Sequence, residues 1–110
     1  MLMNLLIIPV VKAAVEAFQS GDKTAWRHLF AFEADFYDDG CPCDFERFTQ
    51  ETLGYNRFLS IDRVANDGLY IEGDFYSAQS GSFRIYFNFD LNDSGIIRRL
   101  DIGRAEDTDI

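Results

Sequence analysis

Residues 34–45, ADFYDDGCPCDF, bring together more chemically capable groups than any other stretch of this 110-residue chain. The stretch contains four aspartates, a tyrosine and both cysteines of the sequence. Carboxylates can act as general acids or bases, and thiols can bind metal ions or undergo redox reactions. The same residues could also form only a polar turn between a strand and a helix. The elements around them must decide between these possibilities.

The two cysteines favour neither a disulfide nor a metal centre. A bond between Cys41 and Cys43 would be strained, because a single residue separates them. A zinc site would need two further ligands, and the sequence has one histidine, His28. The nearby aspartates could supply oxygen atoms, but their spacing matches no recognised metal motif. We therefore expect reduced structural thiols, and no metal or cofactor.

The formal net charge of −9 disfavours binding to nucleic acids and to anionic membranes, because both carry negative charge. The apolar start of the chain lacks the basic n-region of a signal peptide. Pro9 and Lys12 interrupt it well before the ~20 apolar residues that a membrane span needs. We therefore expect a protein of the cytoplasm.

Helical patterns occupy the N-terminal half. Pro9 suits the first turn of a helix that ends at Ser20-Gly21, with apolar residues at helical spacing. Asp22 can cap a short second helix, in which Trp26, Leu29 and Phe30 would share a face. The stretch 33–39 reads as a short strand. A third helix begins after Asp44 and stops at Gly54.

From residue 57 onward, apolar and polar residues alternate, which is typical of strands with one buried face. The expected strands are 57–65, 69–78, 82–91 and 96–103, separated by Asn/Asp/Gly/Ser turns that favour hairpins. Gly73 interrupts one apolar row and suggests a bend or bulge. The order of elements predicts an α+β fold: a curved antiparallel sheet wrapped over three N-terminal helices. We expect one domain over 1–110, with a core at about 9–104, an N-terminal segment at 1–8 and an acidic tail at 105–110.

Two stretches carry a resemblance to a known superfamily. AAVEAFQSGDKTAWRHLFAFEADFYDDG and FDLNDSGIIRRLDIG resemble the opening and the last hairpin of nuclear transport factor 2-like and SnoaL-like domains. These domains have the ketosteroid isomerase-like cone fold, also described as a cystatin-like α+β cone. The resemblance covers about residues 9–104. It implies a pocket at the wide end of the cone, and superfamily members with isomerase, dehydratase, cyclase or epoxide hydrolase activity or with no known activity.

The resemblance also implies a candidate catalytic residue. The general base of the isomerase falls on Asp38 of this sequence when the strands are aligned through Ala34. Strand alternation agrees on direction: Ala34, Phe36 and Asp38 share a face, and Phe36 must be buried, so Asp38 should point into the cone. The two oxyanion donors of the isomerase align with Ala14 and Phe87. Since neither can donate, a steroid isomerase mechanism is not expected.

Other residues are candidates for ligand contact or for assembly. We expect Trp26, Tyr55, Phe87 and His28 to contact a ligand. The polar face of the sheet should be rich in tyrosine, arginine and acids, and superfamily members often dimerise through it, so a homodimer is expected. The sequence thus predicts binding of a small hydrophobic molecule, with or without cofactor-free acid–base chemistry. The alternative is a non-catalytic module for dimerisation or protein interaction.

Overall fold

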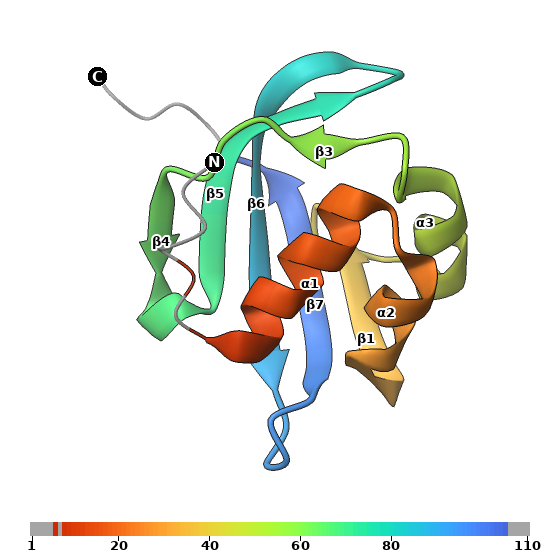
Figure 1. Cartoon of the computed structure of the whole chain (residues 1–110), viewed down its shortest axis with the longest axis vertical. Coiled ribbons are helices and arrows are strands. Elements are labelled where there is room, and N and C mark those ends of the chain that lie inside the picture. The colour runs from red at the N-terminus through yellow and green to blue at the C-terminus, as the bar shows by residue number, and fades with distance from the viewer. Residues whose placement is uncertain (1–5, 7, 106–110) are drawn as a thin grey trace.

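The computed structural model describes residue 6 and residues 8–105 of the chain. Figure 1 shows a curved sheet with helices against one face. The helices are α1 (Pro9–Ser20), α2 (Lys23–His28), α3 (Phe45–Thr52) and the short 3₁₀ helix η2 (Asn66–Gly68). The strands are β1 (Phe30–Asp38), β2 (Cys41–Pro42), β3 (Arg57–Phe58), β4 (Arg63–Ala65), β5 (Tyr70–Ser77), β6 (Gly81–Leu91) and β7 (Ile97–Arg104).

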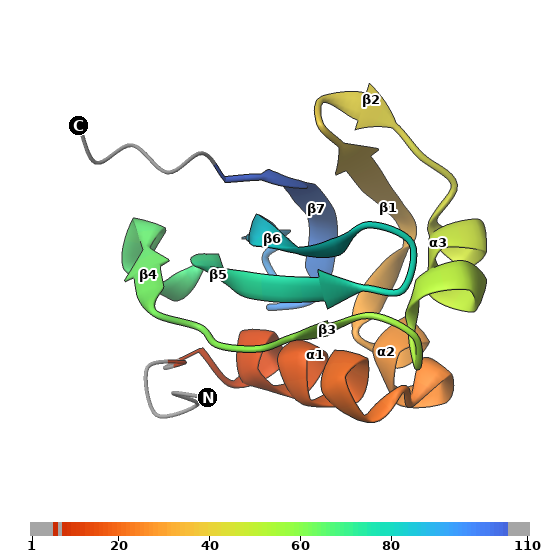
Figure 2. The ribbon, with the colours of Figure 1, turned by 90° about the horizontal axis from the view of Figure 1, so that it is seen from above.

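The strands form one sheet in the order β2-β1-β7-β6-β5-β3, with β4 also paired to β5. The meander β5–β6–β7 is antiparallel, as the hairpin signals predict. Strand β1, in contrast, runs parallel to β7, so the sheet is mixed and not purely antiparallel. The predicted α+β fold, with helices packed on one face of a curved sheet, is confirmed (Figure 2).

Helix α1 covers the middle of the concave face. Pro9 occupies its first turn, and Gly21 ends it in a left-handed conformation with φ of 72°. Glycine adopts this conformation without the steric cost that a Cβ adds. The apolar stripe expected from the sequence is buried, and Phe18 is fully inaccessible. Its ring centroid lies 5.4 Å from that of Phe87 on β6, and this contact holds the helix on the sheet.

Helix α2 is shorter than the sequence pattern predicts. It ends at His28, and Phe30 is the first residue of β1, paired with Ile97 of β7. Phe30 therefore does not belong to the helical face on which we expected it. Its ring is buried instead against the rings of Phe45 and Trp26, with centroids 4.5 Å and 4.8 Å away. A short apolar run fits a helix or a strand equally well, which explains this error.

The expected strand 57–65 is divided into β3 and β4. Both pair with β5, but the chain between them bends across Gly73. A Cβ at position 73 would lie 1.9 Å from the carbonyl oxygen of Ser60, so no side chain fits there. The bend that we expected at Gly73 thus lies in the segment between β3 and β4. This segment approaches β5 closely because Gly73 has no side chain.

Helix α3 is attached through its buried face. The Asp44 side chain accepts a hydrogen bond from the backbone N–H of Glu46 at 3.2 Å and so caps the helix, as predicted. Thr49 is fully buried. Its hydroxyl accepts a 3.1 Å hydrogen bond from the Trp26 indole and donates one to the Phe45 carbonyl. This bond ties α3 to α2 inside the core.

A β-bulge interrupts the alternation of side chains along β7. Asp90 pairs with Arg99, whereas the next residue, Leu91, pairs with Ile97, so Arg98 is an extra residue in β7. Arg98 and Arg99 can therefore both lie at the polar face: Arg98 forms an ion pair with Asp90 at 2.6 Å, and Arg99 bonds to Asp101. Ile97 and the later apolar residues remain on the concave face.

The chain ends fall only partly within the described residues. Leu6 of the expected N-terminal segment is buried, while residues 1–5 and 7 lie outside the described part. Of the expected acidic tail, Ala105 is described and residues 106–110 are not. Among the described helices, none is long and apolar enough to cross a membrane.

The contact at Gly73 can be tested by mutation. We expect Gly73→Ala to lower the free energy of unfolding by about 1–3 kcal/mol, because the new methyl group would overlap the Ser60 carbonyl. Urea unfolding followed by the fluorescence of Trp26 measures the change. Ser82→Ala, at an exposed position of the adjacent strand, serves as the control. Equal stability of Gly73→Ala and the native protein would contradict the described bend.

The attachment of α3 gives a second prediction. Thr49→Val preserves the shape of the side chain but leaves the buried Trp26 N–H without its acceptor. An unsatisfied buried donor costs about 1–3 kcal/mol, and we expect a loss of that size in urea unfolding. Thr24→Val, at an exposed position of α2, should change stability by less than about 0.5 kcal/mol. Similar values for the two variants would show that the hydroxyl does not anchor the helix.

Candidate functional site

A pocket of about 510 Å³ opens between α3 and one end of the sheet. At this end β1, β5 and β7 finish and β6 begins, and Figure 2 looks down on it. Strand β2 and the segment that leads into α3 form a further side. We call this space the inner pocket.

The floor of the inner pocket is apolar. Five phenylalanine side chains and two isoleucines, contributed by the sheet and by α3, line it: Phe36, Phe48, Phe75, Phe83, Ile85, Phe87 and Ile102. Alternation along β6 explains much of this lining, because every second residue of that strand faces the helices. An apolar floor of this kind favours ligands that bury hydrocarbon surface.

Asp38 lies at the mouth of the inner pocket. In the parallel β1–β7 pair, Phe36 is opposite Leu100 and Asp38 is opposite Ile102, so Asp38 shares the concave face with buried residues. This is the direction that strand alternation predicts. Among the described residues, its carboxylate forms no hydrogen bond or ion pair, although it remains accessible to water. The carboxylate is therefore free to meet a ligand.

The electrostatic surroundings of Asp38 favour its protonated form. Partial burial raises the pKa of the Asp38 carboxyl above its ordinary value, and the negative charge of adjacent Asp39 raises it further. A carboxylate in this environment is a stronger proton acceptor than one that is fully solvated. Asp38 thus combines an inward position with raised basicity.

The neighbouring charges at the mouth are held in place by other contacts. Asp39 accepts a 3.3 Å hydrogen bond from the Arg104 backbone N–H, and its own N–H donates to the Ile102 carbonyl at 2.8 Å. The Arg104 guanidinium lies over the ring of Phe83, 4.1 Å from its centroid. These contacts fix the rim and leave Asp38 as its least constrained carboxylate.

A tyrosine from the polar face of the sheet reaches toward the same rim. Gly103 is opposite Tyr86, and a Cβ at Gly103 would lie 2.8 Å from the Tyr86 hydroxyl and 2.8 Å from an Asp39 carboxylate oxygen. The missing side chain therefore lets the two groups approach each other. Burial and the charges of Asp101, Asp39 and Asp38 raise the pKa of Tyr86, which keeps its hydroxyl protonated.

The structure brings together two of the five candidate residues predicted from the sequence. Asp38 and Phe87 both line the inner pocket. Trp26 is instead fully buried in the core, with its N–H bonded to Thr49. His28 is exposed at the end of α2, and neither it nor Trp26 is part of the lining.

Tyr55 lies beside the inner pocket and not in it. A second hollow is formed by the end of α3, the following loop and the β5–β6 turn. Its lining is Arg47, Gln50, Glu51, Thr52, Tyr55, Asn56, Ala78 and Gln79, and we call it the outer hollow. Four of these residues, Arg47, Glu51, Thr52 and Asn56, also line the inner pocket, so the two spaces adjoin.

Sequence reasoning missed the polar groups on the α3 side of the pocket. Thr52 could have been found, because it shares the helical side of Phe48, which faces the pocket. Asn56 and Ser77 carry no comparable signal, because a loop and a hairpin end place them. Arg104 falls at the last position of β7, where alternation alone does not reveal a contact with the rim.

The thiols do not have the structural role that we expected. Cys41 and Cys43 are free, but both are exposed on and after β2, so neither contributes to the core. Cys43 lies at the mouth of the inner pocket. Among the described residues, no group of three His, Cys, Asp or Glu side chains is placed to hold a metal ion.

Comparisons with known proteins place this geometry in a fold. No protein-family model and no curated protein sequence matches the chain. An NTF2-like protein of unknown function from Cytophaga hutchinsonii is similar in structure, with a TM-score of 0.69, 12% identity and 87% coverage of both chains. A Xanthomonas campestris protein with a cystatin-like fold gives 0.70, with 14% identity and 92% coverage of both chains.

An enzyme is also among the similar structures. An LEH-like epoxide hydrolase from M. tuberculosis has a TM-score of 0.64 and 17% identity, covering 89% of this chain and 81% of that one. The TM-scores establish the shared architecture, whereas identities this low say nothing about activity. The chain therefore has the NTF2-like fold, as its resemblance to nuclear transport factor 2-like and SnoaL-like domains predicts.

Proposed function

We propose that the chain binds a small, mostly apolar molecule in the inner pocket and that Asp38 exchanges a proton with it. The observation that carries the proposal is the contrast between an apolar floor and one inward carboxylate without a partner among the described residues. A volume of about 510 Å³ lies within the range of pockets that bind small molecules.

The chemistry that fits these groups is cofactor-free acid–base catalysis. An ionised Asp38 would take a proton from a carbon or hydroxyl group of the ligand and return it to another atom of the same molecule. Isomerisation, dehydration and cyclisation all follow this scheme. The positions of the isomerase oxyanion donors hold Ala14, buried in α1, and Phe87, so charge on a substrate oxygen must be stabilised by other groups.

The described activity of one neighbour supports an enzymatic function without defining it. The M. tuberculosis protein of similar fold is an LEH-like epoxide hydrolase, and the pocket of this chain combines a carboxylate with an apolar floor. The two free thiols suit a reducing compartment, which supports the expected location in the cytoplasm.

A second candidate function is homodimerisation through the face of the sheet opposite the helices. In Figure 2, none of the helices in the described part of the chain covers this face. The rings of Tyr70 and Tyr86 stack there with centroids 5.5 Å apart, and the Arg99 guanidinium lies 4.2 Å from the ring centroid of Tyr37. Tyrosine and arginine are enriched where proteins meet, which favours a contact with a second copy.

Ligand binding gives the first test of this proposal. We expect neutral bicyclic compounds, such as tetralone and naphthol, to raise the melting temperature of the native protein. A ligand at ten times its Kd adds about 1.4 kcal/mol to stability. Thr52→Trp, which places a larger side chain at the pocket wall, should remove this effect. Lys12→Trp, at an exposed position of α1, is the control. Equal melting temperatures with and without each compound would contradict the proposal.

The position of Asp38 gives a pH-dependent test that needs no ligand. Because its pKa is raised in the folded protein, the folded state binds more protons than the unfolded state between the two pKa values. Asp38 therefore lowers stability as the pH rises through that range. We expect Asp38→Asn to be more stable than the native protein at neutral pH, with the difference disappearing in acid.

Urea unfolding at both pH values measures this difference. Asp93→Asn, in the exposed turn between β6 and β7, is the control for loss of one negative charge. A stability difference that is absent at neutral pH, or that grows in acid, would contradict the described surroundings of Asp38. In any reaction found for the protein, Asp38→Asn should abolish turnover and leave the fold intact.

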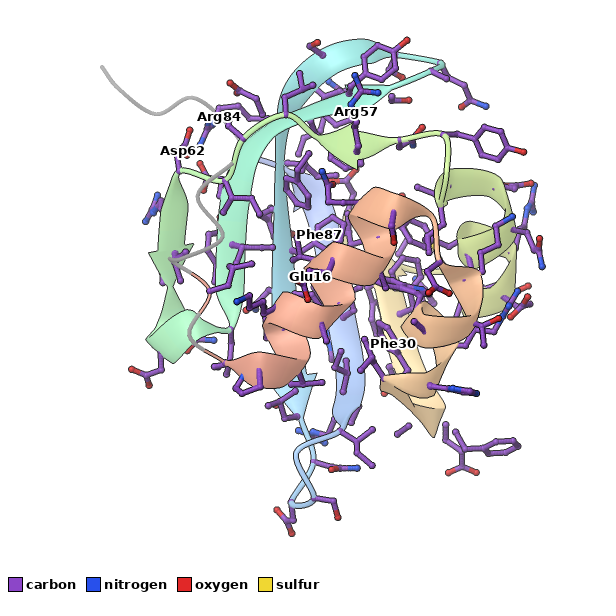
Figure 3. All side chains as sticks on the ribbon, viewed as in Figure 1. Glu16, Phe30, Arg57, Asp62, Arg84 and Phe87 are labelled. Carbon is purple, nitrogen blue, oxygen red and sulfur yellow. The ribbon has the colours of Figure 1, made fainter. Side chains whose placement is uncertain are left out.

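The dimer is tested by light scattering at several concentrations. We expect twice the mass of the 12.6 kDa chain, and a return to the monomer mass in Tyr86→Glu, which adds charge to the tyrosine pair of the uncovered face. Glu16→Lys, on the exposed side of α1, should leave the mass unchanged (Figure 3). A monomer mass for the native chain at every concentration would refute this second candidate.

A further inference from the structure

The outer hollow differs from the inner pocket in chemistry, although the two adjoin. Both spaces have polar and charged side chains on their walls, but the inner pocket also has a floor of phenyl rings and isoleucines, which the outer hollow lacks. Thr52 and Asn56 belong to both spaces and so mark the boundary. A ligand that crosses this boundary needs an apolar part and a polar part.

The charges of the outer hollow balance each other. Arg47 forms an ion pair with Glu51 at 3.3 Å along α3, and these are the charged members of its lining. Neither a cationic nor an anionic ligand group would find an uncompensated partner there. The lining therefore favours an uncharged group.

The remaining polar groups are suited to hydroxyl groups of a ligand. The Asn56 side-chain oxygen accepts from the Ala78 backbone N–H at 3.4 Å, which fixes the amide and leaves its NH₂ as a donor. Within the described part of the chain, the Tyr55 and Gln79 side chains form no hydrogen bond. They offer a hydroxyl and an amide, which can each donate and accept.

Tyr55 also offers a flat surface. Its side chain is 61% exposed, so a face of the ring is accessible to a ligand. An aromatic face next to amide groups can stack on the C–H surface of a sugar ring while the amides bond to its hydroxyls. An unbranched polar group such as an alcohol would use the amides but leave the ring unused.

We infer that the ligand of this site is a glycoside: an apolar ring system in the inner pocket that carries an uncharged sugar in the outer hollow. The inference rests on the proposed function, because the apolar part must occupy the inner pocket. It adds the ligand class and assigns Tyr55 and Gln79, which line the outer hollow alone, to recognition of the sugar.

The test compares a naphthol with its β-glucoside and its β-glucuronide by isothermal titration calorimetry of the full chain. We expect the glucoside to bind at least about threefold more tightly than the naphthol, since one added hydrogen bond contributes roughly 0.5–1.5 kcal/mol. The glucuronide, which adds a negative charge to the same sugar, should bind more weakly than the glucoside. Tyr55→Ala and Gln79→Ala should each raise the Kd of the glucoside by about threefold to tenfold and leave the Kd of naphthol unchanged.

Tyr76→Ala, which removes a half-exposed tyrosine from the opposite face of the sheet, should change neither affinity and is the matched control. If naphthol binds and the glucoside binds no more tightly, the glycoside inference is wrong while the proposed function stands. A glucoside preference that survives both substitutions, or tighter binding of the glucuronide, also overturns it. If none of the three compounds binds, the proposed function fails and the inference fails with it.

Discussion

The rest of the molecule depends on the packing of the Phe18 side chain in the core. Its ring is fully inaccessible and lies within 6.3 Å, centroid to centroid, of rings from α2, α3 and strands β3, β5 and β6. One side chain of α1 thus joins the other helices to the concave face of the sheet. Aromatic contacts of this kind combine a large buried area with defined ring geometry. These rings fill the centre of the concave face. Among the described residues, the inner pocket therefore begins where the cluster of rings ends.

This arrangement explains why the inner pocket lies at one end of the sheet. Phe48, Phe75 and Phe87 contact Phe18 on one side and line the pocket on the other. The pocket floor is therefore the outer surface of the core. Any change that loosens the core would also change the shape of the site. The apolar part of the site is packed against the core, and its polar groups come mainly from the ends of strands and from α3.

The sequence was sufficient for some features because they depend on local patterns. The alternation of Phe36 and Asp38 predicted the inward direction of Asp38, since burial of the first fixes the face of the second. Phe87 was found in the same way, from the period of β6. The fold itself followed from the order of the periodic segments, together with the resemblance to the NTF2-like superfamily.

Other features depend on contacts between distant residues. The parallel pairing of β1 with β7 joins segments more than sixty residues apart, and no local pattern encodes it. Trp26 was expected at the pocket, but its helical spacing places it on the buried stripe of α2, where Thr49 satisfies its N–H. The division of 57–65 into β3 and β4 depends on the approach of Ser60 to Gly73. Tyr55 lies in the loop after α3, which no periodic pattern places, and it lines the outer hollow.

The attachment of α3 has a consequence for how this site can change during evolution. The helix contributes Arg47, Phe48, Glu51 and Thr52 to the pocket walls, yet Thr49 and the rings of Phe45 and Phe48 are what hold it to the core. Residues on its other side can therefore be exchanged without disturbing the sheet or α1. Arg47, Glu51 and Thr52 can therefore vary while Phe45, Phe48 and Thr49 keep the helix in place, so selectivity and stability can be altered separately.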